Sequence, residues 1–195
     1  MRHIKKIGCI LLLSFFFFIS CVETSEKGKE WDNSFLYIDK LSYKGLPLIT
    51  TEKRLVDILG EPDAINTELS IQPSESGSFG DEIECQVYIY YVGVDGLLCF
   101  WVYNNQAIIY RIDFSDPRII LDYKYGSIQL SRSLNYQQAS TLFSAASGTI
   151  TGDGKTYQTL TFNTNSRSKI STYATPILTF SENNLSHLFY YPEFY

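Results

Sequence analysis

The sequence has little histidine, little cysteine and no long hydrophobic run, and each shortage excludes a class of protein. It contains two histidines and four cysteines in 195 residues. The longest apolar stretch, Ile7 to Ile19, covers 13 residues, whereas a transmembrane helix needs about 20. The stretch has instead the length of the apolar region of a secretory signal, about 7–15 residues. We therefore expect an export signal here and not a membrane-spanning helix.

Catalytic or metal-binding chemistry would depend on a single histidine. His3 lies in the export signal, so His187 is the only histidine beyond it. Neither a cysteine nor a second histidine stands near it to complete a zinc site, and the serine-rich segments contain no G-x-S-x-G elbow. Asp113, Asp116 and Asp122 lack the spacing of a calcium loop. We predict a protein that is not an enzyme, with no catalytic residue, no metal and no cofactor.

The segment from Gly148 to Thr156 comes close to a phosphate-binding loop, G-x-x-x-x-G-K-[ST]. Gly154 and Lys155 fit this pattern, but Thr149 stands where the first glycine belongs. A helix should follow such a loop, because its N-terminus holds the phosphates. The residues that follow alternate like a strand instead. We predict a hairpin turn here, without nucleotide.

Positive charge is scarce as well. The chain carries 16 Lys and Arg against 21 Asp and Glu. Removal of an export signal would take Arg2, Lys5 and Lys6 and no acidic residue, which leaves 13 basic and 21 acidic residues and a formal net charge of −8. An acidic surface of this kind excludes electrostatic binding to nucleic acid or to anionic lipid.

The first residues carry the clearest signal in the chain. A basic start precedes the apolar stretch, and Phe18-Ile19-Ser20-Cys21 ends it. These residues resemble the lipobox of bacterial lipoproteins, although Phe18 stands where leucine is preferred. The resemblance implies a signal peptide over residues 1–20, lipidation of Cys21 and a lipid-anchored place in the cell envelope, on the outer membrane of a Gram-negative bacterium. An ordinary signal peptide with an unmodified Cys21 is the alternative.

Two cysteines remain beyond the export signal and the anchor, namely Cys85 and Cys99. An exported pair suggests a disulfide. A hairpin that pairs Val92 with Leu97 would, however, set the two sulfurs several residues apart along the ladder, beyond the reach of a disulfide. We expect two free, packed thiols, with the disulfide as the alternative.

Alternation and turn residues give a coarse map of the chain. Residues 21–33 are polar and charged and should form a flexible tether. A short helix should start at Thr50 or Thr51 and stop at Gly60, and a second should cover 136–146 after an Asn135 cap. The segment 66–82 should be a loop, or a short strand plus a loop. Strands are expected at 35–38, 40–43, 85–92, 97–103, 107–114, 157–163, 177–181 and 188–194.

The two halves of the chain correspond to each other. Leu97 to Phe100 aligns with Ile177 to Phe180 at an offset of 80, which also pairs Asn104 with Asn184, Ile109 with Phe189, Tyr110 with Tyr190 and Phe114 with Phe194. The two helices correspond at an offset of 84. The shared order of helix, strand and hairpin predicts an internal duplication. We expect a first module over 34–118 and a second over 119–195.

A family resemblance lies in the first module. The pattern Thr51-x4-Val56-x2-Leu59-Gly60-x-Pro62, followed by the aromatic strands and an Asn-rich turn, is similar to the module of the outer-membrane assembly lipoproteins of the SmpA/OmlA type. The β-lactamase inhibitor protein consists of two such modules in tandem. The resemblance implies an α+β fold with two tandem helix-plus-antiparallel-sheet modules, whose short helices pack on one sheet face and leave the other open.

The predicted hairpin register places aromatic residues on the open sheet face. Tyr88, Tyr90, Trp101 and Tyr103 would share this face with Arg111. Exposed aromatic residues beside an arginine are typical of protein-binding patches. We therefore expect a non-catalytic protein-binding module, of the envelope-assembly or inhibitor type. A glycan-binding or small-ligand-binding lipoprotein is the alternative, because aromatic platforms also stack on sugars, and internal cover of the aromatic face is a third.

Overall fold

The computed structural model describes residues 32–71, 82–125, 128–152, 154–163 and 175–190. The predicted signal peptide, Cys21 and nearly all of the predicted tether lie outside these residues. The segment from Trp31 to Tyr195 is one compact unit, to which both predicted modules contribute. The boundary between the modules at 118/119 stays a prediction.

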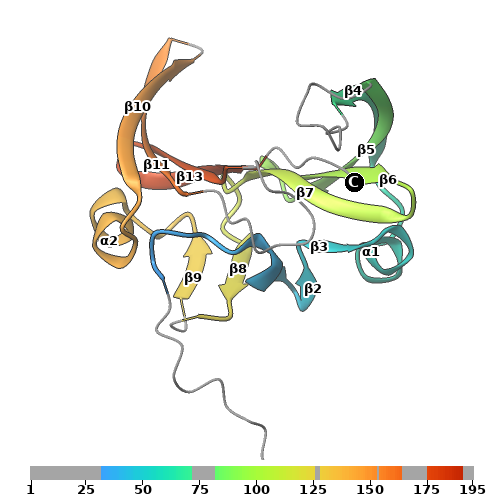
Figure 1. Cartoon of the computed structure of the whole chain (residues 1–195), viewed down its shortest axis with the longest axis horizontal. Helices are drawn as coiled ribbons and strands as arrows, with labels where there is room; N and C mark the ends of the chain where they lie inside the picture. The colour runs from blue at the N-terminus through green and yellow to red at the C-terminus, as the bar shows by residue number, and fades with distance from the viewer. Residues whose placement is uncertain (1–31, 72–81, 126–127, 153, 164–174, 191–195) are drawn as a thin grey trace, which may run out of the picture. The chain divides into compact units, whose positions relative to one another are not determined.

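A nine-stranded antiparallel sheet dominates the fold (Figure 1). Two four-stranded meanders build it, and they meet where the last strand of each pairs with the other. The first meander consists of β4 (Ala64–Ile71), β5 (Glu82–Val92), β6 (Gly96–Tyr103) and β7 (Gln106–Asp113). The second consists of β10 (Ala146–Gly152), β11 (Lys155–Thr161), β12 (Ile177–Ser181) and β13 (Asn184–Phe189). The ninth strand, β3 (Ile49–Thr51), pairs with the start of β7.

A second, four-stranded sheet has the order β2-β1-β8-β9. It contains β1 (Leu41–Tyr43), β2 (Leu46–Pro47), β8 (Ile120–Tyr123) and β9 (Ile128–Ser131), and a 3-10 turn (Ile38–Lys40) precedes it. Leu41, Tyr43, Leu121 and Tyr123 alternate with exposed or half-buried residues, so one face of this sheet joins the core. The sequence prediction missed β8 and β9, because each is only four residues long.

Two short helices complete the described part of the chain, α1 (Glu52–Leu59) and α2 (Tyr136–Leu142). The predicted caps are confirmed: the Thr51 side chain accepts a hydrogen bond from the Arg54 amide, and Asn135 forms a capping box. Gly60 ends α1 at φ +86°, a conformation that favours glycine. The second helix ends four residues earlier than predicted, because β10 begins at Ala146 and pairs with β11 there.

The predicted fold class, α+β, is wrong. The helices contain only 8 and 7 residues, and each buries one residue fully, Leu55 and Ala139. Strands make up most of the described chain, in two antiparallel sheets. Of the two alternatives predicted for 66–82, the short strand is confirmed, since β4 extends to Ile71, and the predicted hairpin turn at 148–156 is confirmed in the hairpin β10–β11. The fold is therefore closer to all-β, with a second sheet where the prediction placed helices alone.

The core includes the side of the large sheet that faces the helices, and Val87, Trp101 and Ile108 are buried on the opposite side. A row of fully buried residues crosses the centre of the sheet from β6 to β12: Leu98, Ile112, Leu188 and Leu178. Side chains of the same side contact both helices, since Tyr88 bonds to Glu52 of α1 and Tyr136 of α2 packs on Phe180. We call this side the helix face.

Backbone contacts repeat between the two halves. The Phe114 amide donates to the Ser186 carbonyl, and the Tyr190 amide donates to the Tyr110 carbonyl, both at 2.8 Å. The first residue of each helix makes an equivalent hydrogen bond to a hairpin turn. The Glu52 amide donates to the Asn105 carbonyl at 3.1 Å, and the Tyr136 amide donates to the Asn183 carbonyl at 3.0 Å. These matched contacts support the internal repeat that the sequence predicts.

The offset of the repeat changes along the chain. The strand register shifts after Cys99 in β6 and after Thr179 in β12. These two positions are related by the predicted offset of 80. The last strands correspond instead at an offset of 76, as Phe114 and Tyr190 show. The predicted pairing of Ile109 with Phe189 is therefore wrong, because the second hairpin has fewer residues between the irregularity and its turn.

Candidate functional site

The predicted aromatic face depends on the register of the β5–β6 hairpin, and that register is wrong by one residue. Val92 pairs with Gly96, and not with Leu97 as predicted. Side chains alternate along a strand, so a slip of one residue moves one strand's side chains to the other face relative to its partner. Tyr88 and Tyr90 therefore share a face with Leu98 and Phe100, while Trp101 lies on the opposite face.

Tyr88 and Tyr90 belong to the helix face and are buried. The Tyr88 hydroxyl donates to Oε1 of Glu52 at 2.5 Å, and this hydrogen bond, with burial, raises the pKa of Tyr88 to about 12. The Tyr90 hydroxyl donates to the Gly60 carbonyl at 3.3 Å, and burial raises its pKa to about 12. Both tyrosines thus fasten α1 to the sheet and are not available to a partner.

Trp101 lies on the other face of the sheet and is also buried, at 8 % exposure. Its ring stacks on Tyr110 with 5.1 Å between centroids, and its indole N–H donates to Oε2 of Glu68 at 3.2 Å. Tyr103 is half-buried. The contacts of Trp101 with Tyr110 and Glu68 consolidate the predicted aromatic patch within the first half of the chain.

The less buried part of this opposite face lies where β7 meets β13. Cross-strand pairing places two rows there, Leu97–Asp113–His187–Thr179 and Cys99–Arg111–Phe189–Ile177. All of these residues except Cys99 and Thr179 are half-buried. We call the surface the junction face and define it by Leu97, Arg111, Asp113, Ile177, Thr179, His187 and Phe189.

Arg111 is the cation of the junction face. Its guanidinium carbon lies 5.8 Å from the centroid of the Phe189 ring, in a cation–π contact. Its Nε atom is buried without a hydrogen-bond partner, and the described residues give Arg111 no ion pair. Arginine on an aromatic ring keeps the edge of its guanidinium open for planar, bidentate bonding to a carboxylate. Of the five predicted binding residues, Arg111 is the one whose geometry suits a ligand.

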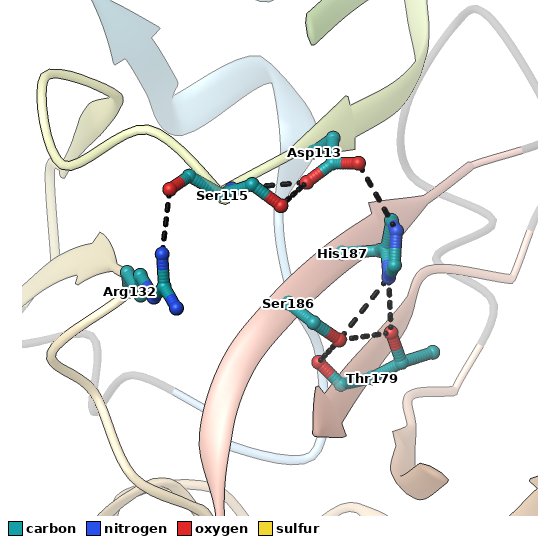
Figure 2. A network of polar contacts seen from close by, with 6 residues as sticks. All are labelled: Asp113, Ser115, Arg132, Thr179, Ser186 and His187. Carbon is teal, nitrogen blue, oxygen red and sulfur yellow. Dashed lines mark hydrogen bonds and ion pairs between the residues drawn. The ribbon is translucent and has the colours of Figure 1, made fainter. Parts of the chain in front are cut away.

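His187 connects the two halves of the sheet through a polar network (Figure 2). Its Nε2 lies 3.4 Å from Oδ2 of Asp113, and its Nδ1 lies 3.1 Å from both the Thr179 and the Ser186 hydroxyl oxygens. A carboxylate cannot donate a proton, so Nε2 is the protonated nitrogen of the pair. His187 is thus held on both sides of its ring.

Asp113 anchors the other end of the network. Its Oδ1 accepts from the Ser115 amide at 2.9 Å and from the Ser115 hydroxyl at 2.6 Å. Burial alone would raise the pKa of Asp113, but the hydrogen bonds from His187 and Ser115 lower it to about 2. Arg132 extends the network by donating to the Ser115 carbonyl at 2.7 Å. The carboxylate therefore ties β7, the following loop and β13 together.

An Asp–His–Ser order invites comparison with a nucleophilic triad, but the geometry differs. The Ser186 hydroxyl donates to the Thr179 carbonyl at 3.0 Å, so its proton is directed away from the imidazole. Thr179, the other hydroxyl near Nδ1, is 1 % exposed. A triad needs a nucleophile that gives its proton to the base and faces the substrate. The network holds strands together and positions no nucleophile for attack.

Cys85 and Cys99 are both free and buried, as expected. They lie on one face in the corrected register, because Cys99 pairs with Ile89, four residues along β5 from Cys85. Burial raises the pKa of both thiols. A raised pKa keeps a thiol protonated and unreactive, so neither cysteine is a candidate nucleophile.

A groove of about 790 Å³ lies between β9 and α2. Its lining combines hydroxyl and amide groups with three apolar side chains, and none of the described lining residues is charged. The lining residues are Ile128, Gln129, Ser131, Ser133, Leu134, Asn135, Gln137, Gln138, Thr141 and Leu142. The sequence prediction did not point to this groove, because β9 was not recognised and the amides of α2 look like an ordinary solvated helix surface.

Within the described ranges, His, Cys, Asp and Glu form no cluster of three that suits a metal ion. No helix in that same part of the chain has the length and apolar character needed to cross a membrane. No family model, curated protein or solved structure matches the sequence or the fold.

Proposed function

We propose that this chain is a lipid-anchored, non-catalytic protein of the cell envelope that binds another protein through its junction face. Cys21 supplies the anchor, after the apolar stretch Ile7 to Ile19 and the lipobox-like Phe18-Ile19-Ser20. Two acyl signals are needed for stable membrane attachment, and a lipidated N-terminal cysteine carries more than one chain. The partner is an envelope-assembly component or a protein that this chain inhibits.

Arg111 carries the proposal. Removing a polar atom from water without a partner costs about 1–3 kcal/mol, and the buried Nε of Arg111 is such an atom. The chain has an excess of acidic residues, yet this arginine is paired with none of those described. A carboxylate from a partner would bond to the terminal nitrogens of the guanidinium beside the Phe189 ring, because Nε itself is buried. Arginine and aromatic residues at the centre of an interface often dominate its binding energy.

The proposed contact residues differ from the predicted set. Arg111 is retained, and Tyr103 is half-buried on the same side of the sheet, four residues along β6 from Cys99, which pairs with Arg111. Tyr88 and Tyr90 are removed, since they hold α1. Trp101 is removed because it is buried on Tyr110.

A purification from native membranes tests the proposal. The full-length protein should recover its partner, and Arg111→Gln should lose at least tenfold of it. Lys53→Gln on α1 is the matched control, because Lys53 is an exposed cation on a helix that packs on the helix face and not on the junction face. Equal recovery with Arg111→Gln would remove the junction face as the site. Loss of the partner with both variants would mean that recovery depends on the overall charge of the protein and not on Arg111.

The groove between β9 and α2 supports a second candidate function, the binding of a neutral glycan or small polar ligand. Its volume lies in the range of small-ligand sites, about 300–1,000 Å³, and its uncharged hydroxyl and amide lining suits sugar hydroxyls. Gln137, whose side chain is exposed in the groove, is the residue to substitute. Calorimetric titration with envelope oligosaccharides should show saturable binding that Gln137→Ala weakens, and the absence of heat would exclude this candidate.

A further inference from the structure

The strand β10 forms one edge of the nine-stranded sheet and differs from a protected edge. It pairs with β11 alone among the described residues, and Figure 1 draws it at the margin of its meander. Each of its seven residues is exposed. Natural sheets guard their edges with charges, prolines or covering segments. The sequence Ala146 to Gly152 contains no charge and no proline.

The centre of β10 is a palindrome. Gly148-Thr149-Ile150-Thr151-Gly152 reads the same in both directions. An antiparallel copy placed about a two-fold axis at Ile150 would therefore meet an identical sequence. Ile150 would face Ile150 of the second copy, and Thr149 would face Thr151 of the second copy. Threonine pairs and β-branched pairs are favourable across antiparallel strands.

The hydrogen-bonding pattern of β10 agrees with this axis. The β10–β11 hairpin closes with Gly152 opposite Lys155, a two-residue connection whose closing pair is hydrogen-bonded. Bonded and non-bonded pairs alternate in an antiparallel ladder. The amides and carbonyls of Ile150 therefore point to β11, and those of Thr149 and Thr151 point outward. An axis at Ile150 pairs the outward groups of Thr149 with those of Thr151 in the second copy.

We infer that β10 pairs with β10 of a second copy of this chain, antiparallel and centred on Ile150, so that two sheets become one continuous sheet. We assign a second copy of this chain as the partner of the β10 edge because the edge sequence is self-complementary and carries no charge that would select another protein. Ile150 is 48 % exposed, and this pairing covers it. The strand contact is short, so attachment of both copies to one membrane would favour it through effective concentration.

Cysteine cross-linking in membranes from cells that express the full chain tests the register. Residues opposite each other in a non-bonded pair have Cα atoms about 4.5 Å apart, which lies in the range of a disulfide. Ile150→Cys should therefore yield a disulfide-linked dimer on oxidation. Thr149→Cys alone should not, because Thr149 of one copy lies opposite Thr151 of the other. The unaltered protein gives the background from its own cysteines.

Ile65→Cys on the opposite edge strand, β4, is the matched control, because Ile65 is 53 % exposed and lies in an edge strand too. Equal cross-linking at Ile65, Thr149 and Ile150 would mean random collision and would overturn the inference. The absence of an Ile150→Cys dimer would overturn the inference as well. A partner of the β10 edge would then have to be a different protein. The proposed function does not depend on either result.

A second measurement uses charge. Ile150→Lys in both copies should abolish the dimer, since equal charges would meet on the axis, and Ile150→Glu in both copies should do the same. A lysine copy and a glutamate copy carrying different tags should purify together. If the lysine copy and the glutamate copy do not purify together, although circular dichroism shows that both are folded, the result would contradict a contact centred on Ile150.

Discussion

Ile112 and Leu188 lie opposite each other at the centre of the contact between the two halves of the large sheet. Both are fully buried, and each pairs on its other side with a buried leucine of its own hairpin, Leu98 or Leu178. The matched bonds of Phe114 and Tyr190 flank this pair. The pair is therefore the local centre of an approximate two-fold relation between the halves, and it fixes how the junction face is assembled.

Leu188→Ala should destabilise the whole chain and not the second half alone. Truncation of a buried leucine costs about 2–5 kcal/mol, and Leu188 touches the core at the point where the halves join. Denaturant unfolding should show a single transition at lower denaturant concentration. Ile120→Ala is the control, because Ile120 is 40 % exposed and its truncation should cost well below 1 kcal/mol. Two separated transitions would contradict one shared core.

The free energy of unfolding should depend on pH through Asp113. Its pKa is about 2 in the folded chain and about 3.9 when unfolded, so the folded state favours the carboxylate. The stabilisation is fully present above about pH 4 and is lost as the pH falls through the folded pKa of about 2. The side chain is 18 % exposed, and the effect should be on the order of 2 kcal/mol.

The measurement for Asp113 is the difference in unfolding free energy between the unaltered chain and Asp113→Asn, taken from pH 7 to pH 2. The difference should stay constant at neutral pH and shrink toward pH 2. Asp57→Asn removes an exposed carboxylate that pairs only with Lys53 on the helix surface, and it should show little change. A difference for Asp113 that does not shrink in acid would mean that its carboxylate is not held by His187 and Ser115.

Trp101→Ala should unfold or strongly weaken the chain. Removal of a buried tryptophan costs about 3–5 kcal/mol, and Trp101 also holds Glu68 through its indole N–H. A binding residue on an open surface would show the opposite, a stable protein that has lost its partner. Thermal unfolding of Trp101→Ala and Trp101→Phe separates the two, since phenylalanine keeps part of the stacking on Tyr110. An unchanged melting temperature for Trp101→Ala would contradict its burial.

Cys21→Ser should release the protein from the membrane. Without the thiol there is no site for the diacylglyceryl group, and the described residues offer no helix that could replace it. Labelled palmitate should enter the unaltered protein and not the variant. Cys9→Ser is the control, because Cys9 lies inside the apolar stretch and ahead of Cys21. Membrane retention of the Cys21→Ser protein would mean that another part of the chain holds it.

Local features were predictable from the sequence, and long-range pairing was not. Thr51 and Asn135 cap the helices as predicted, because a cap needs only the few residues around it. The β5–β6 register depended on whether the turn has three or four residues between paired positions, and the choice of Leu97 over Gly96 moved Tyr88 and Tyr90 to the wrong face. One residue of error therefore changed the candidate site.

The candidate site itself combines distant parts of the chain. Asp113 and His187 are in contact only because β7 pairs with β13. Their spacing in the sequence does not predict that contact. A two-fold relation between the halves was the available signal, but the predicted offset of 80 would have paired the wrong residues of β13. Arg111 lies on the predicted face for a different reason. The turn after β6 has two residues between Tyr103 and Gln106 and not three as assumed, but the irregularity after Cys99 restores the pairing of Arg111 with Cys99. Its aromatic neighbour is Phe189 and not the predicted tyrosines.

Site-specific photo-cross-linking at the junction face tests the central claim most directly. A benzophenone amino acid in place of Ile177, which is half-buried on this face, should capture one defined envelope protein in intact cells. The same probe at Ile58 on α1, which is 42 % exposed, should not capture it. The account predicts that Arg111→Gln abolishes the cross-link from Ile177 while the protein remains folded. A cross-link that persists unchanged in Arg111→Gln, or that forms equally from Ile58, would contradict it.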